Sequence, residues 1–356
     1  MAAAEQKPVR VALIGYGFVG KTFHAPLITA TPGMELTCVV SSRPDAVHAD
    51  LPDVAVVDDQ QAAQGVDLVV VAAPNAMHAP LAADAMRAGR HVVVDKPFTL
   101  DVDEARSLRA LAAQHDRLLS VFHNRRWDSD FLGVEQVIES GRLGEVVQFE
   151  SHFDRFRPEV RDRWRERSEP GGGLWFDLGP HLIDQALQLF GLPQSVTAGI
   201  AVLRPGGSAD DWAHVLLSYE HLRVILHASM VTAGGTARFT VHGTSGSLVK
   251  QHLDPQEDQL KAGMRPRDPG WGVDDDPFVL YLGDGSREEL PAPIGDQGRY
   301  YAGIRDAVLG IAPTPVTSAQ ALAVMAVVEA GLVSAHEGRS VELELTDDER
   351  DAFAEA

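Results

Sequence analysis

Three residues of the chain are of types that could move a hydroxyl proton: Lys96, Asp177 and His181. His181 lies four residues after Asp177, so the two share a face if this segment is helical. Histidine titrates near neutrality, and an adjacent carboxylate can raise its pKa and fix its tautomer. Such a pair can remove a proton from a hydroxyl group. The spacing is equally compatible with a structural role, in which Asp177 caps a helix and His181 lies on its surface.

The sequence around these residues indicates how they are positioned. Residues 171–173 are three glycines, whose backbone can fold close to a ligand. Pro180 is tolerated only near a helix start, which predicts that Asp177 lies at or near an N-terminal end. Lys96 follows a predicted strand, residues 91–95, at the end where open α/β sheets bind ligands. A solvent-exposed lysine that ends a strand is the more common alternative.

A dinucleotide-binding motif follows the first predicted strand. The apolar run Val9–Ile14 is typical of a buried parallel strand, and glycines with the spacing G-x-G-x-x-G come after it. In a dinucleotide site these glycines allow a tight turn, close approach of the pyrophosphate, and close helix–strand packing. A helix predicted from about residue 19 to 29 would point its N-terminal N–H groups at the phosphates. We assign these residues to cofactor binding: Gly15, Tyr16, Gly17, Phe18, Val19 and Gly20.

The end of the second predicted strand, residues 35–40, bears on the choice of cofactor. NAD enzymes usually place an acidic residue there, on the ribose hydroxyls. This chain instead has Ser41, Ser42 and Arg43. These residues could hold a 2′-phosphate, whose charge the arginine would match. We therefore expect NADP rather than NAD, although a polar turn before Pro44 would explain the same residues.

Two later predicted strands, residues 67–72 and 91–95, end on the same side of the sheet and so face the cofactor crevice. Pro74 stops the first, and Asn75 is a good N-cap for a helix that runs to about residue 88. His78 lies one turn into that helix, where a packed or surface histidine is the usual finding. We assign these residues to cofactor binding as well: Pro74, Asn75, His78, Asp95 and Lys96.

Two polar stretches are candidates for substrate contact. Residues 123–128, HNRRWD, either line the substrate crevice or form a charged helix start. The arginine-rich residues 155–167 either hold an anionic substrate or the cofactor phosphate, or form a solvated or intersubunit face, which is more common. The residues assigned to the substrate are Lys96, Asn124, Arg126, Trp127, Arg163, Trp164, Asp177 and His181.

The order of predicted elements indicates two domains. Strands and helices alternate through residues 1–123, which predicts a Rossmann-type, doubly wound parallel sheet. Residues 124–356 predict an α+β domain with a large, open, mostly antiparallel sheet, because several alternating strands follow with few helices between them. We expect residues 254–277 to form a long loop over the crevice or the subunit boundary, and two helices, residues 299–309 and 318–337, to close the chain. Too few helices remain to cover both faces, which favours a homodimer or homotetramer.

The composition excludes some classes of binding partner and indicates the cellular compartment. The chain has 356 residues, 45% of them hydrophobic, and a formal net charge of -20, which argues against nucleic acid or an anionic membrane as partner. Cys38 is the only cysteine, so no intrachain disulfide can form, as fits a reducing compartment. We see no signal peptide and no stretch of membrane-spanning length, so we expect a cytoplasmic protein. We expect no metal site.

The chain resembles the Gfo/Idh/MocA family of NAD(P)-dependent oxidoreductases over about residues 9–341. The resemblance rests on four motifs in order: GYGFVG, APNAMH, DKP and GGGLWFDLGPH. It implies that Lys96 hydrogen-bonds the reacting hydroxyl and contacts the cofactor ribose, that Asp177 and His181 are the paired catalytic residues, and that Asn75 and His78 lie near the nicotinamide. Many members have glutamate in an E-K-P motif where this chain has Asp95.

Within that family the chain is similar to NADP-dependent scyllo-inositol dehydrogenases, which implies a cyclitol or sugar substrate. The implied reaction is reversible hydride transfer between a secondary alcohol carbon and the nicotinamide. His181 would take the hydroxyl proton, Asp177 would orient His181, and Lys96 would polarise the oxygen. Two alternatives remain: a regulator that binds dinucleotide without turnover, and a redox-neutral glycosidase that uses tightly held NAD.

Overall fold

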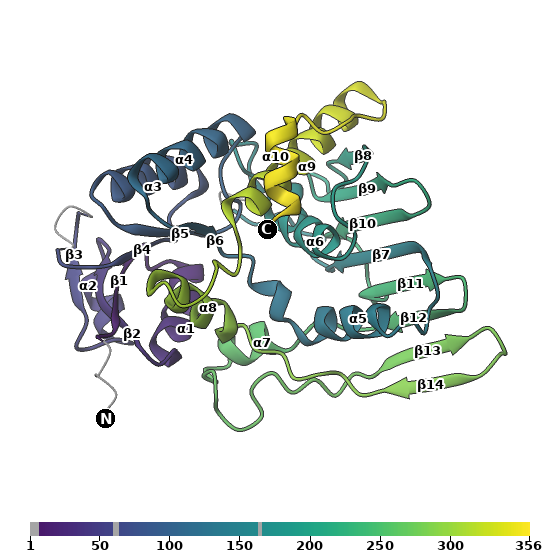
Figure 1. Ribbon diagram of the computed structural model, residues 1–356, viewed down its shortest axis with the longest axis horizontal. Coiled ribbons are helices and arrows are strands. Elements are labelled where there is room, and N and C mark those ends of the chain that lie inside the picture. Colours follow the sequence, from purple (N-terminus) through teal and green to yellow (C-terminus); the bar gives the residue numbers. More distant parts are fainter. Residues whose placement is uncertain (1–6, 60–63, 163–165) are drawn as a thin grey trace.

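The computed structural model describes residues 7–59, 64–162 and 166–356, and two β-sheets dominate it (Figure 1). The first sheet is parallel throughout, with the strand order β3-β2-β1-β4-β5-β6. The order reverses between β1 and β4, and in such sheets ligands bind at this switch point. The strands are β1 (Val9–Ile14), β2 (Met34–Val40), β3 (Ala55–Val57), β4 (Leu68–Val71), β5 (His91–Val94) and β6 (Leu119–Val121).

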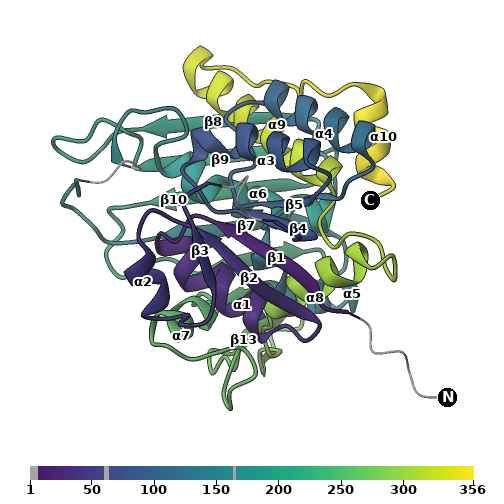
Figure 2. The same cartoon turned by 90° about the vertical axis from the view of Figure 1, so that its left-hand side faces the viewer.

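Helices cover both faces of this sheet, which explains why its strands are apolar on both sides. In β4 all four residues are buried: Val69 and Val71 face one core, and Leu68 and Val70 face another. α3 and α4 lie on one side of the sheet and α1 on the other (Figure 2). The helices are α1 (Ala25–Ala30), α2 (Pro44–His48), α3 (His78–Arg87) and α4 (Val102–His115).

The second sheet has eight strands in the order β14-β13-β12-β11-β7-β10-β9-β8. Only the central pair of β7 and β10 is parallel, and every other neighbouring pair is antiparallel. The strands are β7 (Val146–Asp154), β8 (Ser195–Ala201), β9 (Trp212–Ser218), β10 (Arg223–Ser229), β11 (Phe239–Gly243), β12 (Gly246–Lys250), β13 (Phe278–Leu282) and β14 (Arg287–Leu290). The predicted fold class is confirmed.

Helices cover one face of the second sheet. α6 (Leu174–Phe190) packs on β7, β9 and β10, and α9 (Ser318–Glu337) packs on β8. Burial alternates along β7 accordingly: Phe149, Ser151 and Phe153 are buried, whereas the residues between them are partly exposed on the opposite face. The opposite face of this central part of the sheet therefore stays accessible in the single chain.

The C-terminal part of the chain also packs against the first sheet. α8 (Gly298–Val308) contacts α1, and α9 contacts α4 and β6. α9 has 20 residues and a mean hydropathy of 1.6, enough by length and composition to cross a membrane, so the expectation that no segment reaches that length is wrong. However, 72% of its apolar window is buried inside the fold, as in a core helix.

Several elements differ from the expected ones. The hairpin of β13 and β14 was not expected, because Arg287–Leu290 is too charged to show an apolar pattern. A third closing helix, α10 (Asp347–Ala354), has no buried residue and begins with a capping box at Thr346. The expected loop at residues 254–277 contains a short helix, α7 (Gln256–Lys261). α5 (Ser129–Glu139) lies between the last strand of the first sheet and the first strand of the second.

Candidate active site

A cavity of about 480 Å³ lies where the end of β5 meets α6 and the helical segment after β1. It joins residues far apart in the sequence, from the glycine turn near residue 18 to α7 near residue 261. The lining residues are Phe18, Val19, Phe23, Asp95, Lys96, Phe122, Asn124, Arg125, Arg155, Arg157, Arg161, Asp177, Leu178, His181, Glu257 and Lys261. The three predicted catalytic residues thus border one space.

Lys96 and Asp177 are joined across the two domains. The Lys96 ammonium donates to the Asp177 side chain at 3.0 Å and to the Asp177 backbone carbonyl at 2.7 Å. Both side chains are largely buried, with exposed fractions of 12% and 20%. A lysine ammonium has three donor hydrogens, so this arrangement leaves one for a group in the cavity.

α6 places Asp177 in its first turn and His181 one turn later. Pro180 lies inside this helix rather than at its start. The cap of the helix comes from a distant residue, because the Asp210 carboxylate accepts from the Trp175 N–H at 2.7 Å. Gly173 is required for this contact, since a Cβ there would lie 1.8 Å from an Asp210 oxygen. That glycine therefore serves helix packing and not close approach of a ligand.

His181 is 6% exposed, and its Nδ1 has no hydrogen-bond partner within the described part of the chain. Burial, and then the positive charges of Lys96 and Arg125, lower the pKa of His181 well below its ordinary value. We expected a neighbouring carboxylate to raise this pKa, and the structure reverses the sign. At neutral pH the imidazole is uncharged and can accept a proton.

The residues before and beside Lys96 are also buried. Asp95 lies 3.5 Å from the Nε2 of His24, whose Nδ1 is 2.6 Å from the Tyr301 hydroxyl. Burial alone would raise the pKa of Asp95, but its contact with His24 and the Lys96 charge bring it below the ordinary value. Asp95 is therefore a fixed negative charge next to Lys96.

Asn75 and His78 are held by the protein backbone. Asn75 makes no side-chain cap; its amide donates to the Gly171 carbonyl at 2.9 Å and so links β4 to the turn before α6. His78 is fully buried, with its ring nitrogens 2.8 and 3.0 Å from the carbonyls of Pro97 and Ala73. Neither side chain lines the cavity. Both instead hold the segments after β4 and β5 through hydrogen bonds to backbone carbonyls.

The glycine turn fits a dinucleotide. A Cβ at Gly15 would lie 2.4 Å from the Ala72 carbonyl oxygen, and one at Gly20 would lie 2.2 Å from the Gly15 carbonyl oxygen. A Cβ at Gly17 would meet no atom within 4 Å, so the second glycine borders open space. The helical segment that follows runs from residue 18 to 30. These are the steric roles that a bound pyrophosphate requires of the three positions.

The Arg43 guanidinium bends back to the glycine turn. Its Nη2 donates to the Tyr16 carbonyl at 3.1 Å, and its backbone N–H donates to the Ser41 hydroxyl at 3.1 Å. Ser42 and Arg43 are exposed. The expected cationic and hydroxyl groups therefore lie together at the outer edge of the dinucleotide motif, while Tyr16 itself bonds to Asp50.

In the segment after β6, residues 124–127, some side chains line the cavity and others point into the protein interior. Asn124 lines the cavity and donates to Gln297, and Arg125, which we had not assigned, lines it too. Arg126 instead points inward and binds both carboxylate oxygens of Asp184, at 2.7 and 2.9 Å. Trp127 packs against Tyr300 at 5.8 Å between ring centres and does not line the cavity.

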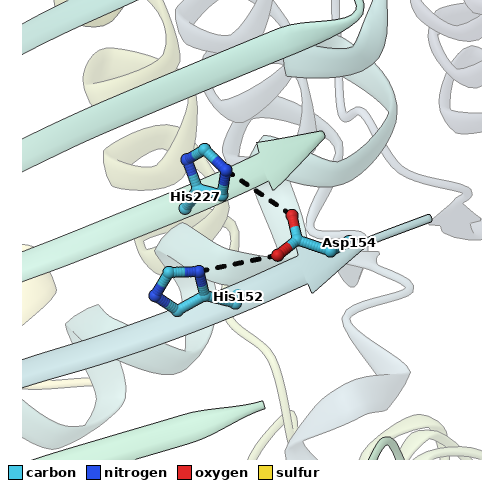
Figure 3. Close-up of side chains that lie close together, drawn as sticks. All are labelled: His152, Asp154 and His227. Carbon is cyan, nitrogen blue, oxygen red and sulfur yellow. Dashed lines mark ion pairs between the residues drawn. The ribbon is translucent and has the colours of Figure 1, made fainter. Parts of the chain in front are cut away.

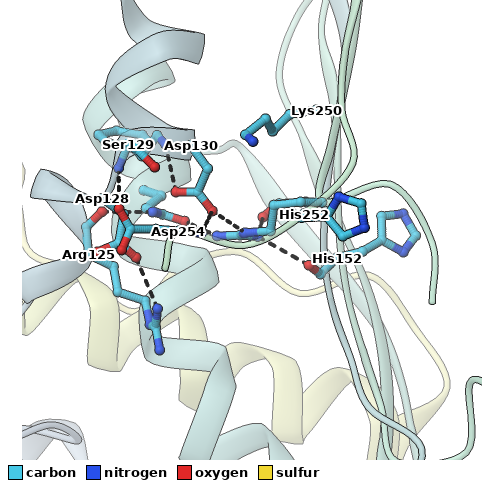
Figure 4. Close-up of polar contacts among 12 residues, drawn as sticks. Arg125, Asp128, Ser129, Asp130, His152, Lys250, His252 and Asp254 are labelled. Carbon is cyan, nitrogen blue, oxygen red and sulfur yellow. Dashed lines mark hydrogen bonds and ion pairs between the residues drawn. The ribbon is translucent and has the colours of Figure 1, made fainter. Parts of the chain in front are cut away.

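Arg125 is held in place by a buried polar network. It donates to Asp128 at 2.9 Å and to Glu257 at 2.6 Å. Figure 4 shows this residue beside Asp128, Ser129 and Asp254, whose carboxylate accepts from the Ser129 N–H at 2.6 Å. Burial opposes ionisation of Glu257, but Arg125 and Lys261 lower its pKa to about 2. The network fixes a cation at the cavity wall.

The arginine-rich segment contributes three cations to the same cavity: Arg155, Arg157 and Arg161. Arg163 and Trp164 lie outside the described residues. We had named residues 155–167 as a candidate for substrate or phosphate contact without assigning Arg155, Arg157 or Arg161 individually. The other lining residues that had no individual assignment are Phe23, Phe122, Arg125, Leu178, Glu257 and Lys261. Glu257 and Lys261 belong to α7, which lies within residues 254–277, the segment expected over the crevice or the subunit boundary.

Two family models match the chain. The one described as "Oxidoreductase family, NAD-binding Rossmann fold" matches residues 9–123, and the one described as "Oxidoreductase family, C-terminal alpha/beta domain" matches residues 135–343. The "Uncharacterized oxidoreductase YdgJ" of Escherichia coli (strain K12) is 52% identical and covers 92% of this chain and 96% of its own length. The "scyllo-inositol 2-dehydrogenase (NADP(+)) IolW" of Bacillus subtilis (strain 168) is 35% identical, and the match covers 94% of this chain and 96% of that protein's length. The crystal structure of a putative oxidoreductase from Klebsiella pneumoniae is 58% identical, with a TM-score of 0.93, and covers 98% and 99% of the two chains.

Proposed function

The chain belongs to the Gfo/Idh/MocA family of oxidoreductases, and from this premise we propose that it transfers a hydride between NADP(H) and a cyclitol or sugar. The reacting group is a secondary alcohol or the corresponding ketone. One observation carries the proposal: Lys96, bound to Asp177, shares a cavity with His181 and with Phe18 and Val19 of the dinucleotide motif.

The side chains divide the work as follows. NADP, when bound, supplies the carbon that accepts the hydride. His181, uncharged at neutral pH, accepts the proton of the substrate hydroxyl. The remaining N–H of Lys96 donates to the substrate oxygen as negative charge develops there. Asp177 keeps the Lys96 ammonium at this position through two hydrogen bonds.

Arg43 supports NADP over NAD as the cofactor. Its guanidinium donates to the Tyr16 carbonyl of the glycine turn, and its backbone N–H donates to the Ser41 hydroxyl; a guanidinium is well suited to a phosphate. The relative from Bacillus subtilis carries NADP(+) in its name. We further propose a cytoplasmic homodimer or homotetramer, which the single cysteine and the accessible sheet face support.

The cavity charges favour a substrate with a carboxylate or phosphate group, and we propose that this acidic subset of sugars and cyclitols is preferred. Among the described residues, six lining side chains are cationic and three are acidic, in a chain whose net charge is -20. A cavity of one sign attracts ligands of the other and concentrates them. The cations are Lys96, Arg125, Arg155, Arg157, Arg161 and Lys261, and the acids are Asp95, Asp177 and Glu257.

A substrate panel tests the proposal. Inositols, neutral sugars, uronic acids, sugar phosphates and their keto forms are incubated with NADP(H) or NAD(H), and nicotinamide absorbance is followed. We expect stoichiometric turnover of NADP(H) with at least one alcohol–ketone pair, faster for an acidic member. NADP binding without turnover of any pair would indicate a regulator, and glycoside cleavage without net cofactor change would indicate a glycosidase. Either result would overturn the proposal.

A further inference from the structure

Three histidines lie in a row on the open face of the second sheet. The register of β10 sets His227 opposite His152 of β7 on one side and opposite His214 of β9 on the other. Side chains two residues apart on a strand point to the same face, so Asp154 of β7 faces this way as well. The sheet pairing therefore brings residues from three strands together, outside the catalytic cavity.

Two of these histidines present a ring nitrogen to the same carboxylate (Figure 3). The Nδ1 of His152 is 3.7 Å from Asp154 Oδ2, and the Nε2 of His227 is 3.6 Å from Asp154 Oδ1. Both distances are too long for good hydrogen bonds. Two ligand atoms about 2.1 Å from a tetrahedral Zn²⁺ would lie about 3.4 Å apart. The two observed separations, which involve different oxygens of the carboxylate, are slightly longer than this distance.

In each of these two rings, the nitrogen that does not face Asp154 lies within hydrogen-bond distance of another side chain. The Nε2 of His152 is 3.2 Å from a Glu150 carboxylate oxygen, and the Nδ1 of His227 is 3.2 Å from the Nδ1 of His214. Metal-binding histidines usually donate from the second ring nitrogen to a carboxylate, a backbone carbonyl or water, which fixes the tautomer and leaves the other nitrogen for the ion. Glu150 is such a partner for His152. The Nδ1 of His152, which faces Asp154, and the Oδ1 of Asp154 are buried and have no hydrogen-bond partner within the described residues.

We propose that His152, Asp154 and His227 bind a divalent transition-metal cation of the Zn²⁺ type. Their ligand atoms all lie within 4.8 Å of one another. Two imidazoles and one carboxylate suit zinc and its neighbours among the transition metals, whereas Mg²⁺ and Ca²⁺ prefer oxygen ligands alone. Three protein ligands leave a fourth position for water or another group.

The place of the site indicates what the ion would do. It would tie the ends of two parallel strands together, since Asp154 is the last residue of β7 and His227 lies two residues before the end of β10. Arg155, the next residue, lines the catalytic cavity. The ion would therefore fix the point from which the arginine-rich segment leaves the sheet. This role does not require that the proposed reaction be correct.

Calorimetric titration of ZnCl₂ into the full-length, chelator-treated protein tests the proposal. We expect one ion per chain, with a Kd in the micromolar range or tighter. His227→Gln and His152→Gln should each weaken binding at least about 10-fold, whereas His221→Gln, at an exposed histidine outside the cluster, should leave it unchanged. Circular dichroism of each variant verifies that it is folded.

Cobalt provides an independent readout. Co²⁺ added to the wild-type protein should give the visible absorption of a low-coordinate site, and His227→Gln should lose it. The His181→Ala variant should retain both zinc binding and the cobalt spectrum, because His181 lies in the catalytic cavity. Absence of stoichiometric binding to the wild type, or binding that survives in both His152→Gln and His227→Gln, would overturn the proposal.

Discussion

The Asp177 carboxylate lies 3.0 Å from the Lys96 ammonium, and the backbone carbonyl of the same aspartate lies 2.7 Å from it. One residue at the start of α6 therefore holds the end of β5 through two contacts. This contact is one of those that join the two domains, and it lies at the cavity. It also gives Asp177 a role toward Lys96, in addition to any effect on His181.

We predict that the Lys96–Asp177 pair acts as a unit in turnover. Lys96→Met should reduce kcat strongly, because the substrate oxygen would lose its charged donor. Asp177→Asn should also reduce kcat, because the ammonium would lose its charged partner. The double variant should be little worse than the poorer single one, since effects within one catalytic unit are not additive. Steady-state kinetics of all three variants measure this, and fully multiplicative losses would refute the coupling.

For the cofactor, we predict that Arg43→Ala raises the KM for NADP about 10- to 100-fold, the value of one hydrogen bond to a charged group. The KM for NAD should change little, since NAD has no 2′-phosphate. Ser41→Asp should move the preference further toward NAD by repelling that phosphate. Kinetics with each cofactor measure these ratios. A wild-type enzyme with a higher kcat/KM for NAD would contradict the account.

Two arginines of the same segment provide a matched comparison for the substrate. Both arginines are exposed, but Arg161 lines the cavity, whereas Arg167 does not line it and pairs with Asp162 at 2.6 Å. Arg161→Ala should raise the KM for an acidic substrate by several-fold to about 10-fold and leave the KM for NADP unchanged. Arg167→Ala should change neither. Equal KM values for an acidic substrate in the two variants would argue against a cationic substrate site.

The buried pair of Arg126 and Asp184 should matter to stability. Its side chains are 8% and 3% exposed, so Asp184→Ala would leave a guanidinium without its charged partner. We expect the free energy of unfolding to fall by about 3–5 kcal/mol. Asp84→Ala, which breaks an exposed pair with Arg87, should cost at most about 1 kcal/mol. Urea unfolding measures both, and a similar small loss for the two variants would contradict the structural role.

Local patterns in the sequence predicted the parallel sheet well, because each continuous apolar strand and each glycine turn can be recognised from a short segment of sequence. The spacing of Asp177 and His181 indicated a shared helix face, but only the family resemblance implied that Lys96 acts with them; the structure places all three at one cavity. That Arg126 binds Asp184 in the interior while Arg125 lines the cavity could not be predicted, because the two residues are adjacent in one short helical turn. Nor could the His152–His227 contact, which depends on strand register.

The pH dependence follows from the environment of His181. Because burial and nearby cations lower its pKa well below the ordinary value, the base form is fully present at neutral pH. We therefore expect kcat/KM for alcohol oxidation to be flat near neutrality and to fall only as the pH drops below that lowered pKa. A profile that rises through neutrality would mean that His181 keeps an ordinary pKa or that another group is the base.

The comparison of His181→Ala with the wild type tests the central claim most directly. The measurement is kcat/KM for the best alcohol substrate of the panel, with the Kd for NADP determined by fluorescence on the same preparations. Removal of a general base costs about 100- to 10,000-fold in rate, so we predict a loss in that range with little change in NADP affinity. A variant that binds NADP and retains most of its activity would contradict the account.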